Sequence, residues 1–529
     1  MLTYSTIAGG QPADTAAMTN HLLTQTLPRE VADLARYYTR GMEGGSAEDR
    51  AVAELVEDVS KGQLSYSEAI SELMLRYADR GADPDDEETR FGKRLAETLE
   101  QRDFEAAYGP PVAEPRRDMH PLVARGLGVD PDRGVTREEI NALLAGRRAD
   151  GEEIEGKRYA SVRQVTDRRT GEVKDLTPIG SVDFCLTPDK SVSVAWAFAR
   201  PAEGASIYTA HRDAAAEAMA VIEGRIGQAR KGNGGRDGAD PGHIAWIAFD
   251  HYTSRPTLWT TRHEGGRTVT ESVAVHVAGD PDLHTHFTVP NAVFCENGRV
   301  GSLDLDRLDG LIKEAGALYQ AHLAANLRRL GAEVVLDDRT GMARLAAIPD
   351  AVRDHFSKRT LGGEEAARAY AKTLGLDWDE LPPERRTGLL KAGVQGMPAG
   401  LDFETRAKLK KDDVANFADW RRQAGELGWE YGGIDGPRRE GPAPTREERL
   451  VQAYEAALPW LERELDRRAV VSGADARTAA TRGLIAAGIE ETADVGRVTA
   501  LFRSEGVRQY GEATSLVWGR PDLTNCAAV

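Results

Sequence analysis

Short stretches in the middle of the chain carry the alternating or β-rich residue pattern that is typical of strands. Residues 181–187 (SVDFCLT) alternate between apolar and polar positions. Residues 244–254 (IAWIAFDHYTS) and 268–277 (TVTESVAVHV) are rich in β-branched and aromatic residues, and they flank the turn-like sequence HEGGR at 263–267. A further strand pattern follows at residues 284–294 (HTHFTVPNAVF). These stretches predict a sheet in the centre of the chain.

Helical patterns surround these strands, so the chain as a whole is expected to be α+β. An Ala-rich helix is predicted over residues 206–230, and a long helix over 308–330 precedes a β-hairpin around DRTG. Thr136 and Glu139 have the spacing of a capping box at the start of a helix. Breaks in the pattern predict segments with the boundaries 1–44, 45–118, 119–350, 351–435 and 446–529.

Composition and charge limit the class of protein. The 529 residues predict two to four domains, and the formal net charge of −17 argues against a nucleic-acid partner unless a local basic groove lies on an acidic body. The three cysteines form no C-x-x-C pair, which favours a reducing, cytoplasmic setting. The sequence predicts neither a signal peptide nor a transmembrane helix, and it contains no P-loop motif.

The histidine pair in DPDLHTHFTVP (280–290) is the strongest candidate for chemistry. On a strand, His284 and His286 project from the same face and could bind a divalent metal. A third ligand would come from His251 or His276. A hairpin with its turn at 263–267 places His284 opposite residues 246–251 and favours His251, with a bulge at 279–282, whereas a tight turn at 279–282 would pair His284 with His276. Two histidines at this spacing also occur as ordinary packed residues.

Several motifs in order resemble the MobF class of conjugative relaxases, the TrwC/TraI type, within the HUH endonuclease superfamily. They are ARYYTRG (35–41), GVTREEINALLAGRRADG (134–151), VDFCLTPDKSVSVAWAF (182–198), FDHYTSR (249–255) with DPDLHTH (280–286), and HFSKRT (355–360). The resemblance implies an HUH relaxase core over 119–350, with a central antiparallel β-sheet flanked by helices and followed by a helical C-terminal region. It also implies site- and strand-specific cleavage of single-stranded DNA at a plasmid transfer origin, through a covalent 5′-phosphotyrosyl intermediate, and later rejoining of the strand.

The resemblance also assigns roles to individual residues. Tyr37 would be the nucleophile, and Tyr38 either a second nucleophile or a packing residue. Asp183 would orient a histidine or help to accept the tyrosine proton. A divalent cation (Mg, Mn or Zn) would be held by His251, His284 and His286. Without the family match, adjacent tyrosines on a helix read more simply as core residues, because their side chains point about 100° apart.

Basic residues in and around the core are candidates for contacts with the DNA backbone. They are Arg147, Arg148, Lys157, Arg158, Arg163, Lys190, Arg230 and Lys231. Lys190 stands at the start of a predicted helix, where a phosphate contact is plausible. The alternative for each of these residues is an ordinary solvated surface.

The sequence departs from the family pattern in three places. The second tyrosine pair is missing, because GMEGGSAEDR (41–50) follows the first. An acidic helical insertion (45–118) separates the tyrosines from the core. Residues 446–529 resemble the small helical start of a relaxase helicase half but lack its P-loop. A separate helicase, and relaxosome or coupling proteins, are therefore expected partners. The rival functions are a non-catalytic relaxase-derived DNA-binding protein, a rolling-circle replication initiator and a hydrolase of small phosphoesters.

Overall fold

The computed structural model describes most of the central part of the chain and several segments on either side. The longer described ranges are 1–9, 47–60, 63–78, 118–132, 135–166, 173–232, 235–254, 257–264, 267–274, 280–357, 416–436, 444–468 and 470–510. Shorter segments and single residues, among them Leu22, are also described. Tyr37, Tyr38 and His276 lie outside the described residues, as does most of the segment 358–415.

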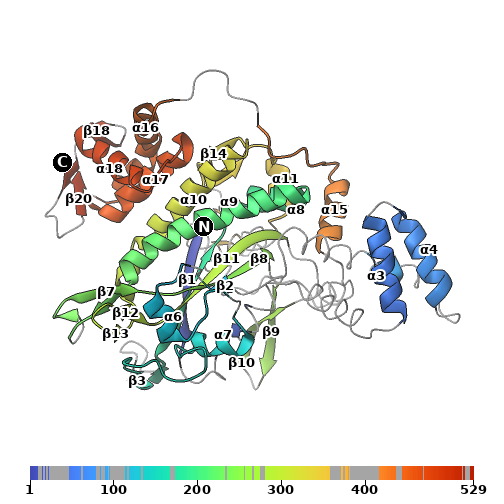
Figure 1. Ribbon diagram of the computed structural model, residues 1–529. Helices are drawn as coiled ribbons and strands as arrows, with labels where there is room; N and C mark the ends of the chain where they lie inside the picture. Colours follow the sequence, from blue (N-terminus) through green and yellow to red (C-terminus); the bar gives the residue numbers. More distant parts are fainter. Residues whose placement is uncertain are drawn as a thin grey trace.

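A five-stranded antiparallel sheet forms the centre of the molecule (Figure 1). Every pair of neighbouring strands in it is antiparallel, as the sequence predicted. The strands are, in spatial order, β1 (Leu2–Ala8), β5 (Ile179–Leu186), β11 (Pro281–Pro290), β8 (Ile247–Thr253) and β2 (Glu114–Pro115). The observed architecture is therefore α+β, with β5, β11 and β8 as inner strands of the sheet.

Alternation along the inner strands separates two faces of the sheet. Val182, Phe184 and Phe287 project into the large hydrophobic core on one face, which is covered by α8 (Lys190–Phe198), α9 (Pro201–Ile226) and α10 (Leu311–Arg329). Ile247 and Phe249 project into a smaller core on the other face, together with α6 (Pro121–Leu127) and α7 (Arg137–Leu144). The capping box predicted at Thr136 and Glu139 begins α7.

Two smaller β-structures extend this core. The strands β9 (Thr257–Glu264) and β10 (Arg267–Ala274) form a hairpin with its turn where HEGGR predicted it. A four-stranded sheet has the order β13 (Val300–Gly301), β12 (Val293–Cys295), β7 (Ala239–His243) and β6 (Gln228–Arg230). The helix predicted over 206–230 therefore ends earlier, at Ile226. Gly227 terminates it, because a Cβ there would meet the Glu223 carbonyl oxygen at 2.7 Å, and the next three residues pair with β7.

The N-terminal helices form a hydrophobic cluster of their own, whereas the C-terminal helices pack on the large core. The acidic segment contributes α3 (Ala47–Ser60) and α4 (Tyr66–Tyr77), which share a small hydrophobic cluster of their own. After α11 (Asp350–His355) and α15 (Asn416–Glu426), the C-terminal region contains α16 (Arg446–Leu465), α17 (Gly473–Ala487) and α18 (Asp494–Ser504). These three helices belong to the same buried cluster as α10. The hairpin predicted around DRTG is present as β14 (Val334–Leu336) and β15 (Ala343–Leu345).

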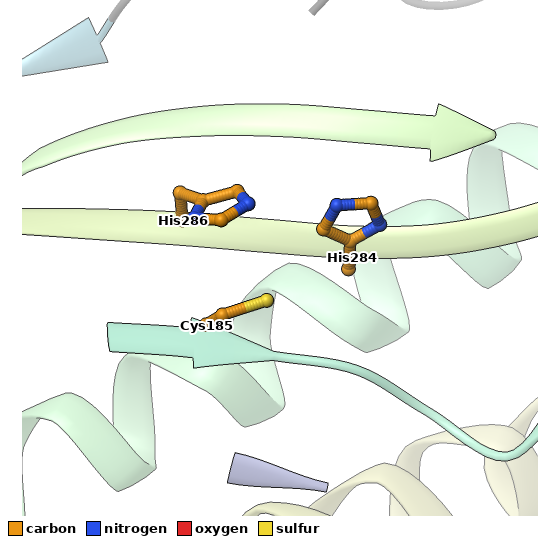
Figure 2. Close-up of side chains that lie close together, drawn as sticks. All are labelled: Cys185, His284 and His286. Carbon is orange, nitrogen blue, oxygen red and sulfur yellow. The ribbon is translucent and has the colours of Figure 1, made fainter. Parts of the chain in front are cut away.

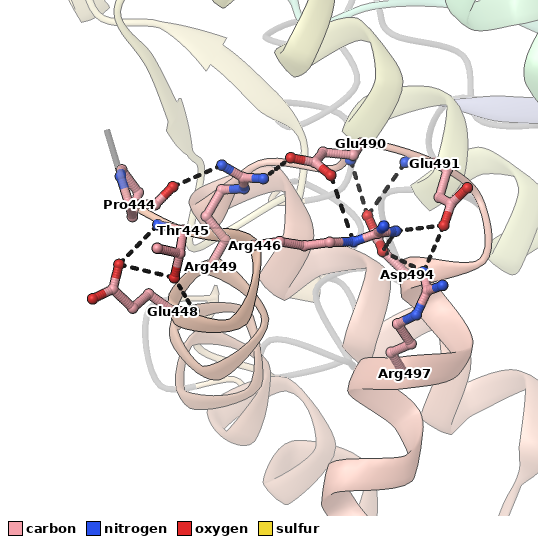
Figure 3. A network of polar contacts seen from close by, with 9 residues as sticks. All are labelled: Pro444, Thr445, Arg446, Glu448, Arg449, Glu490, Glu491, Asp494 and Arg497. Atoms are coloured by element: carbon pink, nitrogen blue, oxygen red, sulfur yellow. Dashed lines mark hydrogen bonds and ion pairs between the residues drawn. The ribbon is translucent and has the colours of Figure 1, made fainter. Parts of the chain in front are cut away.

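Polar contacts tie the C-terminal helices together and to the core. The guanidinium of Arg477 in α17 forms two hydrogen bonds with the Glu314 carboxylate in α10, at 2.6 and 2.9 Å. Figure 3 shows a second network, in which the buried carboxylate of Asp494 accepts hydrogen bonds from Arg446, Arg497 and two backbone amides. Short strands, which the sequence did not predict, add to this region: β16 (Val470–Ser472), β17 (Val507–Gln509), β18 (Glu512–Thr514), β19 (Leu516–Trp518) and β20 (Asn525–Ala528). Among the described residues, no helix is both long and apolar enough to cross a membrane.

Candidate metal centre

Three imidazole rings meet on the sheet face that α6 and α7 share. His284 in β11 stands directly opposite His251 in β8, and His286 lies two positions further along β11. The ring centroids are 5.0 Å apart for His251 and His284, 4.8 Å for His251 and His286, and 5.2 Å for His284 and His286. The register shifts between Pro281 and His284, so the bulge expected near 279–282 is present. The observed partner of His284 is thus His251, while the alternative, His276, lies outside the described residues.

Hydrogen bonds fix the tautomer of each ring. The Nδ1 atom of His284 lies 2.6 Å from the Asp282 carbonyl oxygen, and Nδ1 of His286 lies 2.8 Å from Oδ2 of Asp183. Carbonyl and carboxylate oxygens only accept hydrogen bonds, so both rings donate from Nδ1, and in its neutral form each ring has its lone pair on Nε2. His251 donates instead from Nε2, to the Leu22 carbonyl oxygen at 3.0 Å, and its lone pair is on Nδ1. Three neutral imidazoles oriented by outer hydrogen bonds are a donor set that suits a divalent cation.

The pKa values of the two histidines in β11 shift in opposite directions. Burial lowers the pKa of His284, and the nearby His286 ring lowers it further. Burial also lowers the pKa of His286, but its hydrogen bond with Asp183 and the proximity of Cys185 outweigh this effect and raise the pKa to about 10. In the absence of a cation, the second ring therefore carries the positive charge and forms an ion pair with Asp183.

A polar network on the reverse face of the same strands holds the histidine-bearing segments in register. Thr285, between the two histidines, donates to Oδ1 of Asp250 at 2.6 Å and lies 2.8 Å from Nε2 of His211. Burial raises the pKa of Asp250, but Arg212 and the hydrogen bonds to this carboxylate hold the pKa below its usual range. Sequence reasoning did not identify this network. Its only signal was the presence of polar residues, Asp250 and Thr285, next to each histidine in the strands.

The basic residues that were predicted to contact DNA have different neighbours in the structure. Lys190 reaches the metal centre from the start of α8, where its Nζ atom lies 2.6 Å from the Pro281 carbonyl oxygen and 3.2 Å from Oδ1 of Asp282. Its charge is thus used to fix the start of β11. Arg147 lies 3.7 Å from a Glu153 carboxylate oxygen. Arg158 is exposed in the loop after α7.

The two basic residues of the β6 region also have acidic neighbours. Arg230 forms ion pairs with Asp304 and Asp306, and Lys231 lies 2.8 Å from Oδ1 of Asp240. Arg230 is the last residue of β6, and Lys231 follows it directly. The contacts do not join them to the histidines.

Cys185 is a further residue at the centre that sequence reasoning missed. Figure 2 shows it on β5 beside His284 and His286. Its sulfur and one nitrogen of each of the two rings all lie within 4.8 Å of one another. The spacing of Asp183 and Cys185 matches that of the two histidines, and this spacing is the signal that could have found it.

Comparison with known proteins connects this site to a family. A family model described as TrwC relaxase matches residues 98–427, a range that contains Asp183 and the three histidines but begins after Tyr37. A metal-bound structure of the conjugative relaxase TrwC in complex with oriT DNA is 25% identical, covers 58% of this chain and 88% of its own, and has a TM-score of 0.41. A copper-bound structure of the same relaxase with oriT DNA is 20% identical, covers 82% and 100%, and has a TM-score of 0.43. The TM-scores are too low for either likeness to carry weight. No curated protein sequence matches the chain.

Proposed function

Because the chain belongs to the TrwC relaxase family, the MobF-type conjugative relaxases, we propose that it nicks one DNA strand at a plasmid transfer origin and later rejoins it. The observation that carries this proposal is the meeting of His251, His284 and His286 across two adjacent strands, with Asp183 bonded to the third ring. Such a centre suits the binding of a scissile phosphate beside a cation. A plasmid substrate places this reaction in the cytoplasm.

Tyr37 is the proposed nucleophile. A phenol has a pKa near 10, so its oxygen needs a proton acceptor and a polarised target to react at neutral pH. In the proposed step, the tyrosine oxygen bonds to phosphorus and the phenolic proton passes to a base. The bond from phosphorus to the 3′ oxygen breaks, and this oxygen takes up a proton from solvent to become the 3′ hydroxyl. The resulting 5′-phosphotyrosyl ester conserves the bond energy, so rejoining requires no nucleotide cofactor.

The residues of the centre have separate proposed roles. A divalent cation bound by the three imidazoles would polarise the phosphate oxygens and stabilise the charge of the transition state. Asp183 holds His286 in the tautomer that directs Nε2 away from the carboxylate. Lys190 fixes the bulged start of β11 through Asp282 and thereby positions His284.

Leu22, which precedes the tyrosines in the sequence, lies beside the centre. The side chain of Leu22 is fully buried in the smaller core, and its carbonyl oxygen accepts a hydrogen bond from His251. Leu22 precedes Tyr37 by 15 residues (37 − 22). At up to about 3.3 Å per residue, a connection of this length can reach any point of the histidine face. This contact supports Tyr37 as a nucleophile that the chain itself supplies.

The proposal is tested by incubating the full chain with labelled single strands from the neighbouring plasmid region, with and without Mn²⁺ or Mg²⁺. We expect a protein–DNA adduct on a denaturing gel that Tyr37→Phe abolishes and that EDTA prevents. Tyr38→Phe is the matched control, and it should retain the adduct if Tyr37 is the nucleophile. Binding without cleavage by the wild type would indicate a non-catalytic DNA-binding protein instead. Multiple turnover on small phosphoesters without an adduct would indicate a hydrolase.

The proposed reaction also requires partner proteins. A relaxase needs its strand unwound, and these 529 residues contain no P-loop motif. We therefore propose that a helicase activity outside these residues acts with the chain, along with other relaxosome or coupling proteins. Cleavage only of replication-origin strands would instead identify a rolling-circle initiator.

A further inference from the structure

Cys185 on β5 lies next to His284 and His286. It stands directly opposite His286 in the pairing of β5 with β11, as His251 stands opposite His284 in the pairing of β8 with β11. The thiol and the His251 ring thus flank the two histidines of β11 from its two neighbouring strands. Figure 2 shows the sulfur of Cys185 on the side of β5 that faces both rings.

The hydrogen bonds at Nδ1 leave Nε2 as the ligand nitrogen of both rings when the rings are neutral. Asp183, two positions before Cys185 on the same strand, accepts from Nδ1 of His286 and leaves Nε2 as the ligating nitrogen. His284 is likewise held through Nδ1. One nitrogen of each ring and the sulfur lie within 4.8 Å of one another. A modest contraction would bring these three donors to the distances of about 2.0–2.3 Å from a common ion that zinc requires.

We propose that Cys185, as a thiolate, is a ligand of the metal together with His284 and His286, and that the centre is therefore selective for zinc-class cations over magnesium. The inference rests on the proposed metal centre and names its preferred cation. On binding, the thiol loses its proton to solvent and its sulfur lone pair forms the bond to the metal. Thiolate and imidazole suit zinc and similar ions, whereas magnesium requires oxygen ligands in an octahedron.

A second cysteine, Cys295, belongs to no candidate metal cluster among the described residues and differs in this from Cys185. Cys295 is buried in the large hydrophobic core, and its thiol donates to the Asp240 carbonyl oxygen at 3.9 Å. It behaves as a small apolar residue. Cys185 instead is half-buried on the polar face of β5, next to two potential ligands. Cys295→Ala is therefore a suitable control for a substitution of Cys185.

Cobalt(II) added to the metal-free full chain provides the test, because a cobalt–thiolate bond gives a charge-transfer band in the near ultraviolet that imidazole ligands do not give. We expect the band in the wild type and in Cys295→Ala, and its loss in Cys185→Ser. The surface cluster of His120, His243 and Glu296 contains no thiol and cannot produce it. In competition with a chromophoric chelator, the Cys185→Ser chain should bind zinc at least roughly tenfold more weakly, since loss of even an outer-shell partner typically costs 10–100-fold.

Each outcome decides the assignment. A band that persists in Cys185→Ser, no band in the wild type, or equal zinc affinity of the two chains would overturn it. Adduct formation by the wild type is scored in parallel. A chain that forms the adduct without the band leaves the proposed relaxase function standing. A chain that shows the band but forms no adduct contradicts the relaxase function and leaves the ligand assignment intact.

Discussion

Oδ2 of Asp183 lies 2.8 Å from Nδ1 of His286, although the two residues are 103 positions apart in the chain. The carboxylate is 4% exposed, so solvent screens the interaction poorly. This contact fixes the ring orientation and, in the absence of a cation, holds its proton. It links the strand that carries Asp183 to the candidate metal centre.

Asp183→Asn should weaken metal binding, because the amide keeps the size of the side chain but removes the charge that strengthens the ligand. We expect a loss of about 10–100-fold in Mn²⁺ or Zn²⁺ affinity, measured by titration calorimetry. Asp306→Asn is a matched control, since that carboxylate is 78% exposed and pairs with Arg230 away from the histidines. Equal metal affinity of the two variants would show that Asp183 does not support the centre.

Thr285→Val should destabilise the fold more than Thr288→Val. Both side chains are buried in β11, but the Thr285 hydroxyl contacts Asp250 and His211, whereas the Thr288 hydroxyl donates one longer bond to a carbonyl. Leaving buried partners unsatisfied costs about 1–3 kcal/mol each. Urea unfolding monitored by circular dichroism measures the two free energies. Similar values for both variants would contradict the role given to the network.

His211 predicts an acid-sensitive stability. Burial lowers the pKa of its imidazole to about 3, against 6.5 for the unfolded chain. Below pH 6.5 the unfolded state therefore binds a proton that the folded state does not, and stability falls as the pH decreases toward 3. The loss from this residue is about 1.4 kcal/mol per pH unit. We expect the unfolding free energy of His211→Gln to depend less on pH between 6.5 and 4.5 than that of the wild type, and parallel curves would refute this.

Asp494→Asn should loosen the C-terminal helices. The carboxylate accepts hydrogen bonds from Arg446, Arg497 and the amides of Glu490 and Glu491 (Figure 3). Loss of its charge in this buried setting should cost about 2 kcal/mol. Glu426→Gln removes an exposed ion pair with Arg422 and should cost less than about 1 kcal/mol. Thermal unfolding of the two variants should separate them clearly, and equal melting temperatures would count against the network.

The sequence predicted the pairing of the histidine strands because two local signals agreed. The turn HEGGR predicted that His284 faces residues 246–251, and the observed partner is His251. The spacing of His284 and His286 placed both rings on one face. The helix end at Ile226 was not predicted, because it depends on contacts of Gly227 with the distant β7. Cys185 was not predicted as a ligand, because the sequence has no second cysteine close to it. The partner of Lys190 is 92 positions away, so only packing could reveal that Asp282 neutralises it.

The hydrogen bond from His251 to the Leu22 carbonyl connects the candidate metal centre to the part of the chain that precedes Tyr37. It stabilises the imidazole tautomer that offers Nδ1, so withdrawal of Leu22 would release the other tautomer. If a cation binds at Nδ1 of His251, its affinity and the contact of Leu22 are thermodynamically linked, and each alters the other by the same factor.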